Sequence, residues 1–468
     1  MSDAPHYIST RGRTSRAPRA SFADVLLAGL APDGGLYLPE AWPRLSAAEI
    51  DGLRRGSDYI AVATEILHRF AGGSFSRDEI HADVTAAYAD FDDPAIVPLK
   101  TLAPGLHLLE LFHGPTLAFK DLALQVLGRL FARALQRRGG RATVVVATSG
   151  DTGSAAIAAL GGLPDIDVFV LHPLNRVSEV QRRQMTTAAH ANVHNIALEG
   201  TFDDAQSLVK ALFADTEFAD AVSLTAVNSI NFVRIAAQAV YYFTASRIGE
   251  GSVFVVPTGN FGDVFAGEAA MRMGLPIAKL VIATNANDIL ARALNDGVYA
   301  RGSVHASLSP SMDIQVASNF ERALFEASNR DAAWLRDAMA AFARDGRLVI
   351  PPPVLEALRA RYAAFVCDDA LTLQTMARAQ RDFGEIVDPH TAVALAAALP
   401  WWDAKERNVI VLSTAHPAKF PDAVAKATGA PPPVPERLKG LFDRPESFEI
   451  LPNVKALVRA HIESKLSL

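Results

Sequence analysis

Residues 143–153 read Thr-Val-Val-Val-Ala-Thr-Ser-Gly-Asp-Thr-Gly, and this stretch decides the fold class. Its first half is a continuous apolar run, which is typical of a strand buried on both faces, as in a parallel sheet covered by helices. Its second half is a glycine-containing turn, and an alanine-rich helical pattern follows. The order of strand, polar loop and helix returns later in the chain. We therefore predict an α/β protein built on parallel sheets.

Strand-like runs and helical patterns alternate from about residue 96 onward. The predicted strands are 143–147, 168–171, 252–257, 279–283 and 409–412. The predicted helices are 122–138, 154–160, 202–214, 232–247, 390–399 and 454–466. Before residue 96 the pattern is mixed, with helices predicted at 21–27, 47–55 and 58–71. Two proline-rich stretches, 350–353 and 431–435, are predicted to be linkers or surface crossings.

The predicted domain organisation has four parts. A chain of 468 residues is long enough for about three domains of typical size. We expect an N-terminal module over 1–95 and a C-terminal extension over 431–468. Between them, 96–129 and 231–430 are expected to form a large α/β lobe, and 130–230 a small α/β lobe. The two lobes are expected to meet around a ligand.

The composition excludes several classes of protein. Half of the residues (50%) are apolar and 21% are charged, which fits a globular chain with a substantial core. The formal charge of −6 gives no overall attraction to nucleic acid or anionic membranes. No apolar run reaches the ~18 residues that span a bilayer, and the basic N-terminus lacks the apolar stretch of a secretory signal. The single cysteine, Cys367, fits a reducing compartment.

Three loops follow predicted strands: 148–153, 258–263 and 413–417. In parallel α/β sheets, ligands bind at the carboxyl ends of the strands, and glycines there let the backbone approach a ligand closely. Free N–H groups at a helix start suit an anion. The loops lack the spacing of a nucleotide phosphate loop and of a dinucleotide-binding turn. For any one loop alone an ordinary tight turn is the better interpretation, whereas the three together make a binding site an equally good one.

Lys120 stands just ahead of the long predicted helix 122–138, at the end of His-Gly-Pro-Thr-Leu-Ala-Phe-Lys-Asp (113–121). A lysine in an apolar pocket loses the solvation of its charge, so its pKa falls and its amine becomes nucleophilic. The plain alternative is a surface lysine at a helix start.

The stretches 113–121, 149–153 (Ser-Gly-Asp-Thr-Gly) and 259–263 (Gly-Asn-Phe-Gly-Asp) together resemble the threonine synthase family. The resemblance runs nearly end to end. Further stretches similar to the family's signatures are 7–12, 29–37 and, near the C-terminus, 414–420. Members of this family are pyridoxal-phosphate enzymes of the tryptophan synthase β-like fold. The resemblance therefore implies two parallel-sheet α/β lobes that enclose pyridoxal 5'-phosphate, with an additional N-terminal module.

The resemblance assigns roles around this cofactor. Lys120 matches the lysine that binds the cofactor covalently and then shuttles protons as catalytic base and acid. The loop that would cradle the cofactor phosphate consists of Gly259, Asn260, Phe261, Gly262 and Asp263. Asp151 would lie near the 3′-oxygen, where relatives of this fold often carry Asn. Thr414 would face the pyridine nitrogen, with Ser413 as the alternative if the register differs by one residue.

The resemblance also implies a substrate, O-phospho-L-homoserine. The residues expected near its carboxylate are Thr148, Ser149, Gly150 and Thr152, beside Asp151. Its phosphate is expected at Asn228, Ser229 and Arg234, because a helix cap and an arginine together make an anion clamp. Asn228 or Ser229 is predicted to cap the helix that begins near Asn231. Simple capping beside a surface arginine is the alternative, and the family-like segment 310–322 receives no role.

The implied reaction removes an α-proton and then a β-proton, releases phosphate from the γ-carbon and adds water at the β-carbon to give L-threonine. A phospho-lyase or a serine/threonine dehydratase of the same fold is the nearest alternative. A catalytically dead regulatory binder is an alternative of another class. No metal site is expected, because the histidine spacing does not suit zinc. We further expect a cytoplasmic monomer or weak homodimer without nucleic-acid or membrane partners.

Overall fold

Two parallel sheets form the centre of the molecule, which the computed structural model describes for residues 5–12 and 19–466. The larger sheet has the strand order β13-β10-β9-β14-β4-β3 and is parallel except for the β3–β4 hairpin. Its strands are β3 (Leu99–Ala103), β4 (Leu106–Glu110), β9 (Ser252–Pro257), β10 (Ile277–Thr284), β13 (Tyr362–Val366) and β14 (Val409–Ser413). The side chains of β9 and β14 are buried throughout, as expected for central strands covered on both faces.

The smaller sheet has the order β15-β7-β6-β5-β8 and is parallel throughout. Its strands are β5 (Ala142–Ala147), β6 (Ile166–Pro173), β7 (Val193–Glu199), β8 (Leu224–Thr225) and β15 (Glu449–Pro452). Two short antiparallel ribbons complete the strands. They are β1 (Tyr7–Ser9) with β2 (Tyr37–Pro39), and β11 (Val298–Ala300) with β12 (Arg347–Val349).

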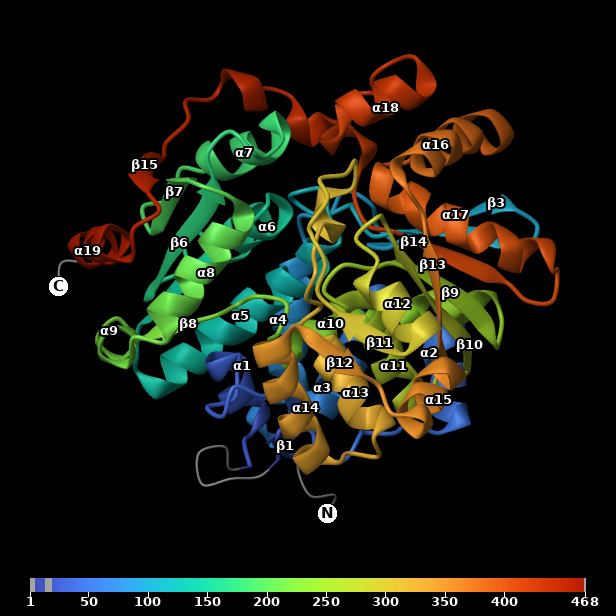
Figure 1. Cartoon of the computed structure of the whole chain (residues 1–468), viewed down its shortest axis with the longest axis horizontal. Coiled ribbons are helices and arrows are strands. Elements are labelled where there is room, and N and C mark those ends of the chain that lie inside the picture. Colours follow the sequence, from blue (N-terminus) through green and yellow to red (C-terminus); the bar gives the residue numbers. More distant parts are fainter. Residues whose placement is uncertain (1–4, 13–18, 467–468) are drawn as a thin grey trace.

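Helices cover both sheets (Figure 1). Those of the N-terminal part are α1 (Phe22–Ala28), α2 (Ala47–Gly56), α3 (Tyr59–Ala71) and α4 (Arg77–Tyr88). Those of the middle part are α5 (Lys120–Arg138), α6 (Asp151–Leu160), α7 (Glu179–Thr186), α8 (Phe202–Phe213), α9 (Thr216–Ala221), α10 (Phe232–Ala245), α11 (Gly262–Arg272) and α12 (Ile289–Asp296). The later ones are α13 (Phe320–Ala327), α14 (Ala332–Asp345), α15 (Pro352–Arg361), α16 (Asp369–Phe383), α17 (Pro389–Asp403), α18 (Pro421–Thr428) and α19 (Lys455–Lys465). Short 3-10 turns lie at Gly72–Ser74, Ser246–Ile248, Pro310–Met312, Pro417–Lys419, Glu436–Leu438 and Leu441–Asp443.

Helix α10 is the central element of the core. Every residue from Phe232 to Ala245 is buried. The helix packs against α11 of the large lobe, against α5, and against α3 of the N-terminal module. A helix that is buried on all sides must be surrounded by other elements of the core. The N-terminal module is therefore part of the same hydrophobic core as the two lobes, and Tyr7 reaches across it to donate to the Phe70 carbonyl (2.8 Å).

The C-terminal segment connects the two sheets. After α18 the chain crosses from the large lobe to the small one, where β15 pairs with β7 and α19 packs beside α8 (red in Figure 1). Helix α5 runs without a break across the predicted boundary at residue 129. The four-part division remains a prediction, but β15 shows that the small sheet is completed from the C-terminal extension.

The predicted strands and helices are confirmed, with ends that differ by about one helical turn at most. The prediction of a linker at 350–353 is wrong, because α15 begins at Pro352. Proline is well suited to the first turn of a helix, where its missing N–H is not needed. The stretch 431–435 does lie outside regular structure. Within residues 5–12 and 19–466, no helix is long and apolar enough to cross a membrane.

Candidate active site

A cavity lies where the loops after β5, β9 and β14 meet the start of α5. Its lining residues are Phe119, Lys120, Asp151, Pro257, Thr258, Gly259, Asn260, Phe261, Gly262, Asp263, Ser311, Met312, His390, Thr414 and Ala415. Lys120, Asp151, Thr414 and the whole 259–263 loop, predicted from separate stretches of sequence, therefore share one cavity. This is the carboxyl end of the sheet, where parallel α/β proteins bind their ligands.

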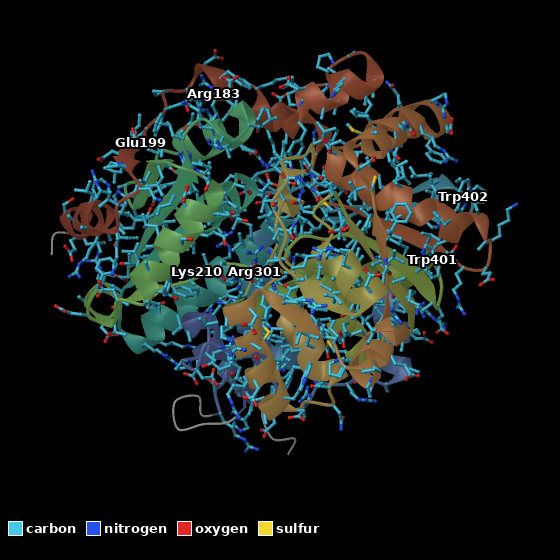
Figure 2. The ribbon with its side chains drawn as sticks, in the orientation of Figure 1. Arg183, Glu199, Lys210, Arg301, Trp401 and Trp402 are labelled. Carbon is cyan, nitrogen blue, oxygen red and sulfur yellow. The ribbon has the colours of Figure 1, made fainter. Side chains whose placement is uncertain are left out.

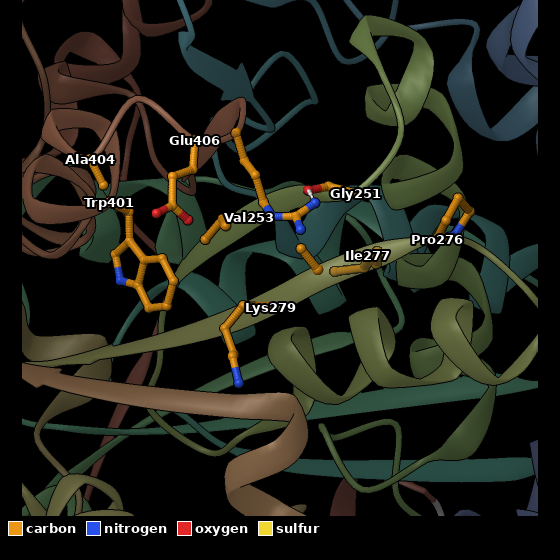
Figure 3. A pocket seen from close by; sticks show the side chains of 10 residues that line it. Gly251, Val253, Pro276, Ile277, Lys279, Trp401, Ala404 and Glu406 are labelled. Carbon is orange, nitrogen blue, oxygen red and sulfur yellow. Dashed lines mark hydrogen bonds between the residues drawn. The ribbon is translucent and has the colours of Figure 1, made fainter.

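A larger hollow of about 320 Å³ lies elsewhere, at the amino ends of β9 and β10. Trp401, one of its lining residues, lies with Trp402 at the outer edge of the large lobe (Figure 2). Figure 3 shows its lining, which includes Trp401, Lys279 and Glu406. This surface hollow is the larger of the two, but the candidate catalytic groups line the smaller cavity at the other end of the strands.

A compact turn over residues 113–121, here called the lysine turn, presents Lys120 at the first position of α5. Asp121 accepts hydrogen bonds from the Thr116 N–H (2.7 Å) and from the Thr116 hydroxyl (2.8 Å). Gly114 is required because a Cβ there would lie 2.5 Å from the Cβ of Asp121. Burial raises the pKa of Asp121 to about 6, although its bonds to Thr116 lower it. The His-Gly-Pro-Thr-x-x-Phe-Lys-Asp pattern thus fixes the direction of one lysine into the cavity.

Lys120 is buried with 9% of its surface exposed. Its Nζ lies 3.2 Å from Oδ2 of Asp151. Burial lowers the pKa of the Lys120 amine; Asp151 opposes this, whereas the positive charges of Lys419 and Arg234 add to the lowering. A lysine with a lowered pKa is a better nucleophile and base near neutral pH.

Asp151 is held from several sides by groups that lie far apart in the sequence. Its Oδ1 accepts from Nζ of Lys419 (2.8 Å) and from Nε2 of Gln181 (2.8 Å). Its Oδ2 faces Lys120 and, at 3.4 Å, the Ser311 hydroxyl. Burial alone would raise the pKa of Asp151, but the charges of Lys419 and Lys120 hold it well below the usual value. Asp151 is therefore a carboxylate at neutral pH.

The 258–263 loop offers backbone groups rather than charges. Among the described residues, no acceptor bonds the N–H groups of Gly259, Asn260 and Phe261. Phe261 adopts a left-handed conformation (φ +69°), and its buried ring is fixed between Phe320 and Tyr362. A residue of this conformation directly before a helix turns successive N–H groups towards one point, where an anion binds.

Position 259 requires glycine for a steric reason. A Cβ there would lie 2.7 Å from the carbonyl oxygen of Ser311, so the loop can pass the 310–312 turn only without a side chain. The two segments therefore form one wall of the cavity.

Asp263, in the first turn of α11, has a pKa shifted in the opposite direction from that of Asp151. Its Oδ1 accepts from the hydroxyls of Tyr241 and Tyr242 (the latter at 3.2 Å), and its Oδ2 has no partner in the described part of the chain. Burial raises the pKa of Asp263 to about 7, although both tyrosines and Lys120 lower it. A large share of Asp263 is therefore protonated near neutral pH.

Thr414 lines the cavity directly after β14, and its backbone carbonyl accepts from the Phe119 N–H (2.9 Å). Ser413, the alternative for the same role, instead places its hydroxyl 3.0 Å from that of Thr391 on α17. Of the two, Thr414 is therefore the residue at the cavity. The adjoining Ala415 forms an antiparallel β-bridge with Ala118. This bridge joins the lysine turn to the C-terminal signature 414–420.

The remaining residues of the 148–153 loop shape the turn around Asp151. The hydroxyl oxygen of Thr148 accepts from the N–H groups of Gly150 and Gly153, both at 2.9 Å. Ser149 and Thr152 are half-buried in this turn. Of this loop, Asp151 lines the cavity, whereas Thr148, Ser149, Gly150 and Thr152 are not among its lining residues.

The prediction that Asn228 or Ser229 caps α10 is wrong. Asn231 is the cap, and its side chain accepts from the Val233 N–H (3.1 Å). Asn228 instead accepts from the backbone N–H two residues on (3.1 Å). Three polar residues that could cap the helix precede it, Asn228, Ser229 and Asn231, and the backbone becomes helical only after Asn231.

Arg234 is buried, with 3% exposed, so the alternative of a surface arginine is wrong. Neither its Nε nor its Nη1 has a partner among the described residues. Burial lowers the pKa of Arg234 to about 10, so it remains charged near neutral pH.

The 310–322 segment, which had no role assigned from the sequence, has two. Ser311 and Met312 line the cavity. The fully buried Arg322 donates to the carbonyls of Tyr37 (3.1 Å) and Ile230 (2.6 Å). The segment therefore connects the N-terminal signatures to the chain just before Arg234.

Sequence reasoning missed His390 and Lys419. His390 lies in the first turn of α17, where its Nε2 accepts from the Ser311 N–H (3.3 Å) and its Nδ1 donates to Asp388 (2.7 Å). The sequence Asp-Pro-His-Thr at 388–391 indicates a helix start with Asp388 as its cap. It does not show which residues would lie beside His390. Lys419 belongs to the quoted signature 414–420, and its complete burial could not be foreseen there.

Together these groups suit a phosphorylated carbonyl compound. The nucleophilic amine of Lys120 can bond a carbonyl carbon, and the N–H groups of 259–261 can bind a phosphate. The unpartnered guanidinium of Arg234 is the kind of group that needs a second anion, because a buried charge without a partner is unfavourable.

Comparison with known proteins agrees with this chemistry. Three family models match the chain: "Threonine synthase N terminus" at residues 6–88, "Pyridoxal-phosphate dependent enzyme" at 95–360 and "Threonine synthase, C-terminal" at 391–462. The threonine synthase of Pseudomonas aeruginosa is 47% identical over 97% of both chains. The solved structure of pyridoxal-phosphate-bound threonine synthase from Brucella melitensis covers 99% of both chains, with 47% identity and a TM-score of 0.94. The yeast threonine synthase structure also covers 99% of both, with 36% identity and a TM-score of 0.92.

Proposed function

The chain belongs to the threonine synthase family of pyridoxal-phosphate enzymes, and we infer that it converts O-phospho-L-homoserine and water to L-threonine and phosphate around Lys120. One arrangement carries this function. A buried amine and a group of unbonded backbone N–H groups line one cavity. The unpartnered, buried guanidinium of Arg234 lies close enough for its charge to help lower the pKa of that amine. The reaction needs an amine for the carbonyl cofactor and two separate sites for phosphate, one on the cofactor and one on the substrate.

The cavity residues fit the cofactor. Lys120 would bind its carbonyl carbon, and Gly259 to Asp263 would hold its phosphate through backbone N–H groups. Thr414 would face the ring nitrogen, and Asp151 would lie near the 3′-oxygen. Pyridoxal phosphate, when bound, supplies a ring that stabilises negative charge on the substrate carbon atoms. Because Thr414 offers a neutral hydroxyl, it favours an unprotonated ring nitrogen and limits how far that charge spreads.

Lys120 is also the proton carrier of the proposal. Once its Nζ is free, the lowered pKa lets a fraction of the amine remain neutral near pH 7, and the neutral amine can accept the α-proton. The nearby charges of Lys419 and Arg234 maintain this state. The protonated amine can return its proton to a later position on the substrate.

Two groups would orient the substrate. Arg234 provides a fork of donors for the phosphate, and its burial strengthens the interaction because water competes little. Asn228 and Ser229 precede it in the chain and are partly exposed, so they can contact the same phosphate. Thr148, Ser149, Gly150 and Thr152 would surround the carboxylate at the start of α6.

Product analysis tests the function. We expect the purified protein, loaded with pyridoxal phosphate, to form threonine and phosphate in equal amounts from O-phosphohomoserine. Formation of 2-oxobutyrate instead would favour a phospho-lyase or dehydratase. No turnover and no visible absorbance after addition of the cofactor would favour a regulatory binder.

We propose further that the enzyme acts in the cytoplasm as a monomer or weak homodimer on this small-molecule substrate, without nucleic acid. The single buried cysteine and the net charge of −6 support this setting. Sedimentation equilibrium of the holoenzyme tests the assembly state.

A further inference from the structure

Lys419 is a second lysine at the active site, and the reaction outlined above does not use it. No part of its surface is exposed. Its Nζ donates to Oδ1 of Asp151 (2.8 Å) and to the Thr116 carbonyl (2.7 Å). A buried ammonium needs such partners, because desolvation is otherwise strongly unfavourable.

The backbone fixes Lys419 between both lobes. It ends the 3-10 turn Pro417–Lys419, which His416 caps by accepting from the Ala418 N–H (3.1 Å). The His416 N–H donates to the Leu117 carbonyl (3.1 Å), inside the lysine turn. The Lys419 carbonyl lies 3.5 Å from the Ser178 hydroxyl, which caps α7 of the small lobe. Lys419 therefore keeps one position relative to both Asp151 and Lys120.

The charges around Asp151 show why this lysine matters. Two ammonium groups flank one carboxylate, and they differ in role. In the proposed function, the nitrogen of Lys120 would hold the cofactor and carry protons, so its charge would change during turnover. Lys419 forms no bond to the cofactor in the proposed reaction: its Nζ contacts Asp151 and the Thr116 carbonyl.

We propose that Lys419 is the positioning residue that holds Asp151 ionised and oriented while Lys120 changes its bonding. This inference rests on the proposed function, because it gives Asp151 the place beside the cofactor 3′-oxygen. An ionised Asp151 can only accept a hydrogen bond there, whereas a protonated one would donate. The Lys419–Asp151 pair is neutral overall. It thus takes the place of a neutral side chain such as Asn. An Asn amide could donate a hydrogen bond at this place, whereas the Asp151 carboxylate can only accept one.

A double-mutant cycle tests the pair. The variants are Lys419→Met, Asp151→Asn and the double variant, with Lys426→Met as a control at an exposed lysine on α18. We expect each single variant at the pair to weaken pyridoxal-phosphate binding by at least about tenfold, since each leaves a buried charge or polar group unmatched. The double variant should recover to within about threefold of the better single variant, because an uncharged amide at position 151 needs no cationic partner.

A second readout is independent of turnover. The visible absorbance of the bound cofactor reports its protonation, so Lys419→Met should shift the absorbance maximum or its pH midpoint. Lys419→Arg, which keeps the charge, should shift it less. Unfolding of the apoprotein should show the same coupling: the two single losses should sum to more than the loss of the double variant.

The outcomes separate the two proposals. If the wild-type protein takes up no pyridoxal phosphate, the proposed function is overturned and this inference with it. If the wild type is loaded normally but Lys419→Met behaves like Lys426→Met, or the two losses simply add, the inference is overturned and the function stands. Should Lys419→Met fail to fold, recovery of a folded protein by the double variant supports the pair, and equal failure overturns it.

Discussion

Two loops of this enzyme place an aspartate in the first turn of a helix at the active site, and the pKa values of the two carboxyl groups are shifted in opposite directions. Asp151 opens α6 in the small lobe, and Asp263 is the second residue of α11 in the large lobe. Both are buried. Lysines hold the pKa of Asp151 low against the effect of burial. Among the described residues, the side-chain hydrogen-bond partners of the Asp263 carboxyl group are tyrosine hydroxyls, and burial raises its pKa to about 7.

The difference teaches that partners, rather than the helix start, decide what each loop can bind. We call Lys120, Asp151, Arg234 and Lys419 the charged half of the site, and the loop 258–263 the backbone half. The charged half uses side chains from distant segments. The backbone half uses N–H groups whose direction is fixed by the buried ring of Phe261. The charged half should therefore respond to changes of charge, and the backbone half to changes of shape.

Apart from the loss of Lys120 itself, the largest effect in the charged half is expected from Arg234→Met. Loss of a buried, hydrogen-bonded charge typically costs about 2–5 kcal/mol, so kcat/KM for O-phosphohomoserine should fall by about 30- to 5000-fold. The change should appear mainly in KM, with cofactor binding little altered. Arg347→Met, at an exposed arginine on β12, is the matched control. An unchanged KM would remove Arg234 from the substrate site.

Asp263→Asn tests the opposite pKa shifts through stability. The pKa of Asp263 is higher in the folded protein, about 7, than its ordinary value of 3.8, so its contribution to stability falls as pH rises from about 4 to 7. From pH 5 to pH 8, this single group should cost about 2–3 kcal/mol in the unfolding free energy of the apoprotein, and Asp263→Asn should remove that slope.

Asp151 gives the contrasting case. Its folded pKa is lowered, so the stability it contributes is present above about pH 4 and lost as pH falls further. Asp151→Asn should therefore change the pH dependence of unfolding only on the acid side. Equal slopes for the wild type and Asp263→Asn between pH 5 and 8 would contradict the contrast between the loops.

The smallest of these effects is expected from Gly259→Val in the backbone half. The added Cβ would lie 2.7 Å from the Ser311 carbonyl oxygen, and the loop must shift. Overpacking of this kind costs about 1–3 kcal/mol, so pyridoxal-phosphate affinity should fall by about 5- to 150-fold. Gly52→Ala, where a Cβ meets nothing within 4 Å, should leave the affinity unchanged. Normal cofactor affinity in Gly259→Val would show that the phosphate binds elsewhere.

Much of the backbone half could be predicted from the sequence because its determinants are contiguous. Strand, glycine loop and helix follow one another at 252–272, and their order alone places the loop at the edge of the sheet. The lysine turn is local as well, since Gly114, Thr116 and Asp121 lie within one short stretch.

The charged half could be predicted only in part, because its contacts are tertiary. Asp151 was predicted, but its partners Gln181, Ser311 and Lys419 come from three other segments. Their residue types are common on protein surfaces, and no spacing marks them as buried. Helix capping at Asn231 rather than Asn228 likewise depends on backbone geometry that a run of polar residues leaves open.

The central claim is that Lys120 is the residue that binds the cofactor. The most direct measurement is borohydride reduction of the holoenzyme, followed by mass spectrometry of its peptides. We predict one cofactor adduct, on Lys120, and in Lys120→Ala no adduct, no visible absorbance and a loss of turnover of about 10⁴-fold or more. An adduct on Lys419, the other buried lysine beside Asp151, or normal turnover in Lys120→Ala would contradict the account.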